Sequence, residues 1–338
     1  MRAYVINRSG GPEVLTIDQV DEPDVRSGTV RVKVQSIGLN YAEIQSRKGL
    51  YGWAPKRPYI LGMEAFGYVD AVADDVTSLV KDQAVIVANQ YGCYAAKVVV
   101  PAAQALPVID YFTPAENAAF AVQYMTAWVA LMKICRIQTG ESVLVQAAAG
   151  GVGTAAVQIA VGQGCRVFGT AGSDDKLELI RSLGAELAIN YRSADFAQLI
   201  RSHQKGAGVD AILEVVGGEV FRKSLDLLDP YGRLAVVGFA SLNLKKLNPW
   251  SWWKTWRAIP RVSISSMATA SQIVGASHLG YLLRDEARMT DIWNKLKAFT
   301  MEHDIRPVVG HEFAFEDMPE AHALMESRQS TGKIVVHV

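Results

Sequence analysis

Cysteine is scarce in this sequence, and its placement forms no recognisable pattern. The three cysteines, Cys93, Cys135 and Cys165, are scattered over 338 residues. No pair has the short spacing of zinc ligands, and an odd number argues against a disulfide framework. We therefore expect a reduced, cytoplasmic environment.

Excess charge and long apolar runs are also missing. Lys plus Arg and Asp plus Glu number 34 each, so the net charge is zero. A balanced charge gives no reason to expect a nucleic-acid partner. No segment approaches the ~20 apolar residues of a transmembrane helix. The first residues show no stretch of signal-peptide length, so we expect neither a spanning helix nor a secretion signal.

The chain changes character along its length. Its first third contains short alternating or apolar runs, such as 30–34 (VRVKV), separated by turn residues. This pattern indicates a small β-rich domain. From 142 to 237, continuous apolar strands alternate with helical patterns, which is typical of a doubly wound parallel sheet. The C-terminal stretch adds helices near 289–299 and 318–327 and a final strand at 333–338. We expect it to return to the first domain.

The strongest local signal is a glycine-rich turn that joins a strand to a helix. Residues 142–153 read SVLVQAAAGGVG. Unpaired N–H groups and the dipole at a helix N-terminus attract a pyrophosphate. Glycines at 150 and 151 leave room for its approach, and Gly153 lets the helix pack closely on the sheet. We interpret this turn as the phosphate loop of a dinucleotide site.

The end of the next strand distinguishes NADP from NAD. NAD sites place an acid there to bind the ribose hydroxyls, whereas this strand ends in GTAGSDDK at 169–176. Ser173 offers a hydroxyl and Lys176 a charge for a 2′-phosphate. Asp174 and Asp175 are the counter-evidence, but we interpret them as the N-cap and first turn of the following helix. The pattern favours NADP(H).

Several motifs together resemble the zinc-independent quinone oxidoreductases of the zeta-crystallin type, a branch of the medium-chain dehydrogenase/reductase superfamily. The similarity covers essentially the whole chain. A later segment with the tryptophans before it is more similar to vesicle amine transport protein homologues, a subgroup of that branch. The matching motifs are GGPEVL (10–15), GLNYAEIQSRKGLY (38–51), LGMEAFG (61–67), AAAGGVG (147–153), GTAGS (169–173), INYR (189–192) and ESRQSTGK (326–333), and the later segment is GASHLGYL (275–282).

The resemblance implies an α/β protein with a GroES-like β-rich catalytic domain and a Rossmann domain with a doubly wound parallel sheet. We place the catalytic domain at 1–121 and 266–338 and the NADP-binding domain at 122–265. The resemblance also implies a homodimer and a cleft that binds a small-molecule quinone or enone.

Carried over residue by residue, the family's pattern implies two sets of site residues. Asn40 and Tyr51 are the candidates for catalysis, and Gln45 departs from the tyrosine that zeta-crystallin-like members have near the nicotinamide. The candidates for binding the cofactor are Asn40, Thr126, Ala149, Gly150, Gly151, Val152, Gly172, Ser173, Lys176, Tyr191, Gly218, Val237, Gly238, Phe239, Ser277, His278 and Arg328.

No zinc site is expected. The positions at which zinc-dependent relatives carry ligands hold Asn40 and Met63, which are not plausible zinc ligands. Without a Lewis acid, an alcohol is a poor hydride donor, whereas a quinone or an enone spreads the added charge over its own π-system. We expect Asn40 and nearby backbone donors to stabilise the enolate oxygen. Tyr51 either returns a proton to the enolate or only packs at the domain edge.

Two interpretations stay open for the tryptophan-rich stretch at 248–257. It forms either a helix that packs or covers the cleft, or a helix that docks on a membrane surface with Lys254 and Arg257 near headgroups. We favour packing because the stretch has few cations, and so expect no membrane contact. The alternatives to a quinone or enone reductase are a nucleotide-binding interaction protein with little catalysis and an acyl-thioester enoyl reductase.

Overall fold

The computed structural model describes residues 1–238 and 261–338, which form two compact units. Unit 1 comprises Met1–Met125 and Leu279–Val338, and unit 2 comprises Thr126–His278. Phe239 and the tryptophan-rich stretch at 248–257, with Lys254 and Arg257, lie outside the described residues.

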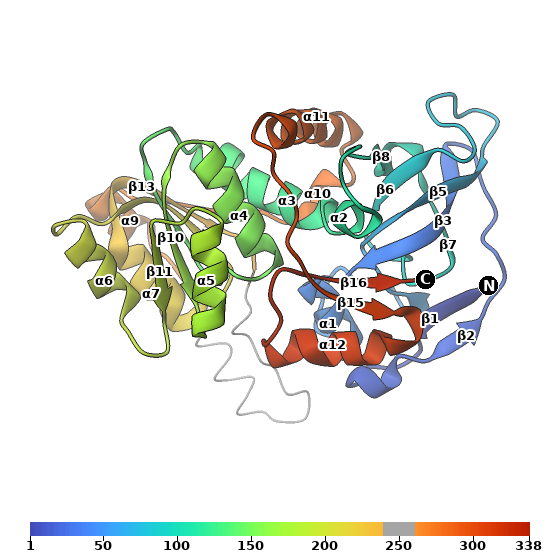
Figure 1. Ribbon diagram of the computed structural model, residues 1–338, viewed down its shortest axis with the longest axis horizontal. Helices are drawn as coiled ribbons and strands as arrows, with labels where there is room; N and C mark the ends of the chain where they lie inside the picture. The colour runs from blue at the N-terminus through green and yellow to red at the C-terminus, as the bar shows by residue number, and fades with distance from the viewer. Residues whose placement is uncertain (239–260) are drawn as a thin grey trace. The chain divides into compact units, whose positions relative to one another are not determined.

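Unit 1 is built on two sheets, and its C-terminal segment joins the larger one. In Figure 1 the red strands β15 and β16 lie in the same sheet as the blue strand β3. Strand β16 pairs with β3 in the antiparallel direction. The smaller sheet has the order β2-β1-β4, and β7 pairs with β3 beside the path of the larger sheet. The smaller sheet contains β1 (Arg2–Ile6), β2 (Ile17–Gln19) and β4 (Tyr59–Ile60), and the larger contains β15 (Val309–Ala314), β16 (Lys333–His337), β3 (Thr29–Gly38), β5 (Glu64–Val72), β6 (Ala84–Ala88), β8 (Ala105–Pro107) and β7 (Lys97–Pro101).

The alternating pattern at 30–34 matches the burial of β3. Val30, Val32 and Val34 are buried in the core of unit 1, while Lys33 faces solvent. Tyr4 packs its ring on Phe315 and donates a hydrogen bond to the carbonyl oxygen of Phe315 at 2.6 Å, which ties the two ends of unit 1 together. The helical elements beside these sheets are η1 (Pro12–Val14), α1 (Tyr41–Lys48), η2 (Ala102–Gln104), α2 (Pro114–Ala118), α10 (Leu279–Leu282), α11 (Glu286–Glu302), η4 (Phe315–Asp317) and α12 (Met318–Ser327).

Unit 2 contains a six-stranded sheet in which every described pairing is parallel (Figure 1). The order β11-β10-β9-β12-β13-β14 is that of a Rossmann fold. This confirms the expected doubly wound sheet. The strands are β9 (Ser142–Val145), β10 (Arg166–Ala171), β11 (Leu187–Asn190), β12 (Val209–Glu214), β13 (Leu228–Val236) and β14 (Ile273–Ala276), and the helices are α4 (Gly151–Gly162), α5 (Asp174–Ser182), α6 (Phe196–His203), α7 (Gly218–Leu227) and α9 (Ile264–Ala270).

The expected boundary at 265/266 differs from the structure. Unit 2 continues to His278, because β14 pairs in parallel with β13 and so completes the Rossmann sheet. The other changeover lies within α3 (Ala121–Trp128), which continues into the π-helical segment η3 (Val129–Cys135). Among the described residues, no helix combines the length and the apolar character needed to cross a membrane.

The contact of α4 with the loop before it requires glycine at position 153. A Cβ at Gly153 would lie 2.3 Å from the carbonyl oxygen of Ala147 and 2.7 Å from Cα of Ala148. Both atoms belong to the backbone, which cannot rotate away. Gly153 therefore lets the helix approach the loop closely, whereas we expected its close contact to be with the sheet.

We predict that Gly153→Ala lowers the free energy of unfolding by about 1–3 kcal/mol, the usual cost of overpacking. Urea denaturation measures this change. Gly150→Ala is the matched control, because a Cβ there meets its nearest neighbour at 3.5 Å. We expect it to stay within about 0.5 kcal/mol of the wild type. Equal stability of the two variants would contradict the packing argument.

Candidate active site

Unit 2 gathers its candidate cofactor residues at one edge of the parallel sheet. Almost all of them follow the carboxyl end of a strand, where ligands bind in open α/β folds. Thr126 lies instead in α3. The groups are Ala149 to Val152 after β9, Gly172, Ser173 and Lys176 after β10, Tyr191 after β11, Gly218 after β12, Val237 and Gly238 after β13, and Ser277 and His278 after β14.

The glycine-rich turn has the geometry of an anion-binding loop. Gly150 is the N-cap of α4, with extended backbone angles (φ −85°, ψ 177°). Ala147 takes a left-handed φ of 51°, and the N–H of Gly150 closes the turn on its carbonyl oxygen at 3.0 Å. The first N–H groups of a helix have no acceptor within the helix. The start of α4 is thus suited to hold a pyrophosphate.

A buried polar network beneath this loop was missed in the sequence. The Thr170 hydroxyl donates to Oε1 of Gln146 at 2.6 Å, and Nε2 of Gln146 donates to the Ser224 hydroxyl at 3.0 Å. The backbone N–H of Ala147 donates to Thr170 Oγ1 at 3.3 Å. The network therefore joins β10, the phosphate loop and α7. Residues so far apart in the sequence left no local signal.

Glu214, the last residue of β12, likewise holds a loop in place through buried hydrogen bonds. It is fully buried and accepts hydrogen bonds from the backbone N–H groups of Val216 and Gly217. Burial raises the pKa of Glu214, while these two donors oppose the shift. Gly217 and Gly218 take left-handed φ angles of 80° and 61°, a conformation that favours glycine. The carboxylate thus fixes the turn that leads into α7.

The corner after β10 brings two cations together. Lys176 is half-buried, and its pKa is lowered by burial and by the nearby charge of Arg192. A Cβ at Gly172 would lie 2.7 Å from Oη of Tyr191 and 3.2 Å from Nε of Arg192. The predicted residues and Arg192 therefore share one corner, which suits a phosphate dianion. Arg192 belongs to the INYR motif but was not recognised as a site residue.

The two aspartates of this corner belong to α5. The helix begins at Asp174, and its N-cap is Ser173 rather than Asp174, so the expected cap was one residue late. Asp174 and Asp175 both lie in the first turn, where carboxylates interact favourably with the helix dipole. Asn190 donates to Oδ1 of Asp174 at 3.1 Å. These contacts support a structural role for the acids, as the sequence interpretation required.

In unit 1, Asn40 lies between a buried ion pair and the start of α1. Its Oδ1 accepts a hydrogen bond from Nζ of Lys333 at 2.7 Å, and its Nδ2 donates to Oε1 of Glu64 at 3.0 Å and to the Gly38 carbonyl oxygen at 3.2 Å. Lys333 also forms an ion pair with Glu64. Oε2 of Glu64 accepts from the N–H of Val122 at 2.9 Å.

This geometry bears on the expected role of Asn40. Both of its amide hydrogens are directed at protein acceptors, Gly38 and Glu64. The amide nitrogen is therefore not free to donate to an enolate oxygen in this arrangement. The cofactor-side role of Asn40 stays a prediction, and its role as a donor to the substrate conflicts with the observed contacts.

A second buried chain of hydrogen bonds supports Asn40 from the other side. Glu43 accepts from the backbone N–H groups of Asn40 and Met63, each at 2.7 Å, and from the Tyr94 hydroxyl at 2.6 Å. Burial raises the pKa of Glu43 to about 7. The Tyr94 hydroxyl also contacts Nε2 of His322 at 2.9 Å.

Arginine sets the direction of this chain because it can only donate. Arg47 contacts Nδ1 of His322 at 3.3 Å, so that nitrogen accepts and the ring proton lies on Nε2. Burial, followed by the charge of Arg47, lowers the pKa of His322 to about 3, so the ring is neutral. Arg47 also pairs with Glu326. The chain therefore points its hydrogens toward Glu43 and holds Asn40 and Met63 in place.

The two remaining candidates of unit 1 are both positioned by loops. Tyr51 follows α1, and its hydroxyl accepts a hydrogen bond from Nε2 of Gln90 at 3.3 Å. Burial raises its pKa, so the phenol keeps its proton at neutral pH. Arg328 is the C-cap of α12, with a left-handed φ of 62°. These contacts are compatible with a proton-donating Tyr51 but do not test that role.

Comparison with known proteins identifies the family. The alcohol dehydrogenase GroES-like domain matches residues 26–110, and the zinc-binding dehydrogenase family matches residues 183–336. The quinone oxidoreductase of Rattus norvegicus is 31% identical over 99% of this chain and 97% of its own. The chain belongs to the medium-chain dehydrogenase/reductase superfamily, in its quinone oxidoreductase branch.

Two further relatives agree with this placement. The synaptic vesicle membrane protein VAT-1 homolog of Homo sapiens is 31% identical over 99% of this chain and 86% of its own length. The quinone oxidoreductase of Thermus thermophilus, which has been solved alone and in complex with NADPH, has a TM-score of 0.82 at 34% identity and covers all of both chains. The expected resemblance is thereby confirmed.

The superfamily includes zinc-dependent members, but the described residues around Asn40 do not fit zinc. Asn40 is committed to Lys333, and Glu64 to Lys333 and Val122. The ammonium of Lys333 would repel a dication placed between these groups. Among the described residues, no group of three or more His, Cys, Asp or Glu side chains is arranged to hold a metal ion.

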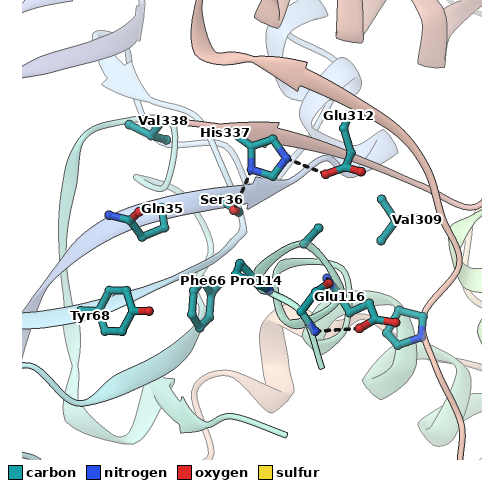
Figure 2. A pocket seen from close by; sticks show the side chains of 13 residues that line it. Gln35, Ser36, Phe66, Tyr68, Pro114, Glu116, Val309, Glu312, His337 and Val338 are labelled. Atoms are coloured by element: carbon teal, nitrogen blue, oxygen red, sulfur yellow. Dashed lines mark hydrogen bonds and ion pairs between the residues drawn. The ribbon is translucent and has the colours of Figure 1, made fainter. Parts of the chain in front are cut away.

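A cavity of about 670 Å³ lies elsewhere in unit 1, away from these candidates (Figure 2). On its wall, Nδ1 of His337 contacts the Ser36 hydroxyl at 3.0 Å, and Nε2 of His337 contacts Glu312 at 2.7 Å. This order resembles a catalytic relay. However, Ser36 is only 1% exposed, and its strand β3 is paired on both edges. A nucleophile needs an open approach, so we assign no chemistry to it.

We predict that Lys176→Ala and Arg192→Ala each weaken NADPH binding by about 10- to 100-fold, since a charged hydrogen bond contributes about 1.5–3 kcal/mol. NADH, which lacks the 2′-phosphate, should bind almost unchanged. Fluorescence titration measures both constants. Lys223→Ala is the control, because Lys223 is exposed and paired with Asp195. Equal losses for NADPH and NADH would refute the phosphate corner.

Proposed function

We propose that this protein is an NADPH-dependent reductase that transfers hydride to quinones or α,β-unsaturated carbonyl compounds without a metal ion. The observation that carries this proposal is the contact of the Lys333 ammonium with Asn40 and Glu64. The ammonium lies against Asn40, one of the positions at which zinc-dependent relatives carry a ligand, and against Glu64 beside Met63, the other such position. Lewis-acid activation of an alcohol therefore has no support in these residues.

The cofactor follows from unit 2 and from the relatives. A relative of the same branch has been solved with NADPH. In this chain, the N-terminus of α4 would hold the pyrophosphate, and Lys176 and Arg192 would hold the 2′-phosphate. The reduced nicotinamide supplies the hydride when it is bound. The protein's own task is to align the acceptor, exclude water and support the charge that develops on oxygen.

The most direct test is an acceptor panel with purified protein. We expect NADPH-dependent reduction of quinones or activated enones, which is monitored as the loss of NADPH absorbance. We expect no oxidation of simple alcohols with NADP⁺. Activity should persist after treatment with a chelator, and elemental analysis should find no stoichiometric zinc. Chelator-sensitive alcohol oxidation would refute the proposal. Activity on acyl thioesters alone would favour an enoyl-thioester reductase, and cofactor binding without turnover would favour the interaction protein.

Tyr51 is the proposed proton donor in enone reduction. We predict that Tyr51→Phe lowers kcat for enones by about 10²-fold, the lower range of general acid catalysis. Quinones should be affected less, because their reduced form can take protons from solvent. Steady-state rates with both acceptors measure the difference. Tyr59→Phe is a matched control, because Tyr59 lies in the same unit and its hydroxyl has no part in the proposal. Enone turnover at the wild-type rate would remove Tyr51 from the mechanism.

We further propose a homodimer in a reducing, cytoplasmic environment. Within the described residues, β14 forms one edge of the Rossmann sheet, and Ile273 on it is half-exposed. Exposed sheet edges readily pair with another strand. Sedimentation velocity at micromolar concentration tests the dimer.

The reducing environment is supported by the three cysteines, which are free thiols.

A further inference from the structure

Lys333 is a charged residue inside unit 1 that the cofactor assignments do not use. It is the first residue of β16, and its side chain is 3% exposed. Its ammonium pairs with Glu64, whose side chain has no exposed surface, and donates to Asn40 Oδ1 at 2.7 Å. A buried charge is tolerated only when it is paired and hydrogen-bonded. Both conditions are met here.

The ammonium determines which way the carboxamide of Asn40 faces. With Oδ1 toward Lys333, Nδ2 reaches Glu64 Oε1 and the Gly38 carbonyl oxygen, so every one of these contacts joins a donor to an acceptor. If the amide were rotated by half a turn, its NH₂ would face an ammonium that has only donors. On the other side, the amide oxygen of Asn40 would face Glu64 Oε1 and the Gly38 carbonyl oxygen, which are themselves acceptors. Without the ammonium, only the weaker preference of Nδ2 for its two acceptors would oppose this rotation.

The backbone is shaped to admit this ion pair. A Cβ at Gly38 would lie 2.1 Å from the carbonyl oxygen of Ala118, 2.9 Å from Cε of Lys333 and 3.0 Å from Cγ of Glu64. The lysine and glutamate side chains therefore pass over position 38 because glycine has no side chain. The pairing of β16 with β3 brings Val335 opposite Gly38, which places Lys333 beside the end of β3 that leads into Asn40.

We propose that Lys333 is a positioning residue that acts through Asn40 in the reduction. The ammonium holds the carboxamide so that Asn40 meets the bound ligand through its oxygen, as a hydrogen-bond acceptor, and not through its NH₂ group. This inference rests on the proposed function, since it assigns a role in turnover. It replaces the expectation that Asn40 donates to an enolate oxygen.

A double-mutant cycle in kcat tests whether Lys333 acts through Asn40. We expect Lys333→Met and Asn40→Ala each to lower kcat for quinone reduction by about tenfold or more, a loss typical of misplaced groups. The double variant should be no worse than about threefold below Asn40→Ala. Lys333→Arg, which keeps the charge and the donors, should retain kcat within about threefold. NADPH affinity should fall no further in the double variant than in Asn40→Ala, because Lys333 acts on the ligand only through Asn40.

Multiplicative losses in the double variant would overturn the proposal, as would wild-type kcat in Lys333→Met. Lys333→Met leaves Glu64 buried without its partner, which is strongly destabilising. The pair Glu64→Gln and Glu64→Gln/Lys333→Met therefore repeats the cycle without a buried charge. In that background, Lys333→Met should again lower kcat only while Asn40 is present.

A spectroscopic measurement tests the geometry without any turnover. In protein labelled with ¹⁵N-asparagine, the NH₂ resonances of Asn40 are identified by their loss in Asn40→Ala. We expect them to shift and exchange faster with solvent in Glu64→Gln/Lys333→Met than in Glu64→Gln alone, while Lys223→Met leaves them unchanged. Identical resonances in all these proteins would refute the positioning role. A wild type that reduces no acceptor would refute the proposed function, and this measurement would still decide the placement of Asn40.

Discussion

Glu64 is a carboxylate without exposed surface, and its compensation organises one end of unit 1. An unpaired charge in such a place would cost several kcal/mol, and breaking a buried pair typically costs about 3–5 kcal/mol. Three groups meet this requirement: the Lys333 ammonium, the Asn40 amide and the N–H of Val122. The absence of a side chain at Gly38 leaves room for the ion pair. Strand β16, the start of α1 and the start of α3 are fixed relative to β5 by one side chain.

The same principle operates in unit 2 with less charge. Glu214 is buried at the end of β12 and accepts hydrogen bonds from two backbone N–H groups. Gln146 and Thr170 link β10 to the glycine-rich loop. Hydrogen bonds to a charged group contribute more than neutral ones, and a partly satisfied network is costly. Internal hydrogen bonds thus hold the loop that would bind the pyrophosphate without any contribution from a ligand. Such preorganisation lowers the entropic cost of binding.

The sequence predicted those features that depend on local pattern. Alternating apolar runs and strand–helix alternation indicated the Rossmann sheet, and the glycine-rich turn marked the connection from β9 to α4. The strand end at 169–176 favoured NADP(H) because it lacks an acid at the position where NAD sites have one. The two units change over after His278, beyond the expected boundary near 265. The sequence did not indicate this because β14 is too short to be assigned to either domain by periodicity. Only its pairing with β13 assigns it.

Other features depend on residues that meet only in the folded chain. Lys333 was quoted as the end of a motif, and its contact with Asn40 spans almost the whole sequence. Arg192 reaches the corner after β10 because β11 pairs with β10, and Gln146 meets Ser224 because β9 pairs with β12, the strand that precedes α7. No periodicity or spacing encodes such long-range pairs. For the same reason, nothing in the sequence indicated that both amide hydrogens of Asn40 are already directed at Gly38 and Glu64.

The charge at this place also constrains which chemistry unit 1 can support. A Lys333–Glu64 pair is neutral overall, and its ammonium is already surrounded by acceptors. Building a zinc site here would require the replacement of Asn40 and Met63, which are not plausible zinc ligands. It would also require the removal of the ammonium, because a cation repels a dication at short range. Substrates that accept a hydride and delocalise the resulting negative charge do not need that metal. This reasoning supports the quinones and enones that we propose as substrates.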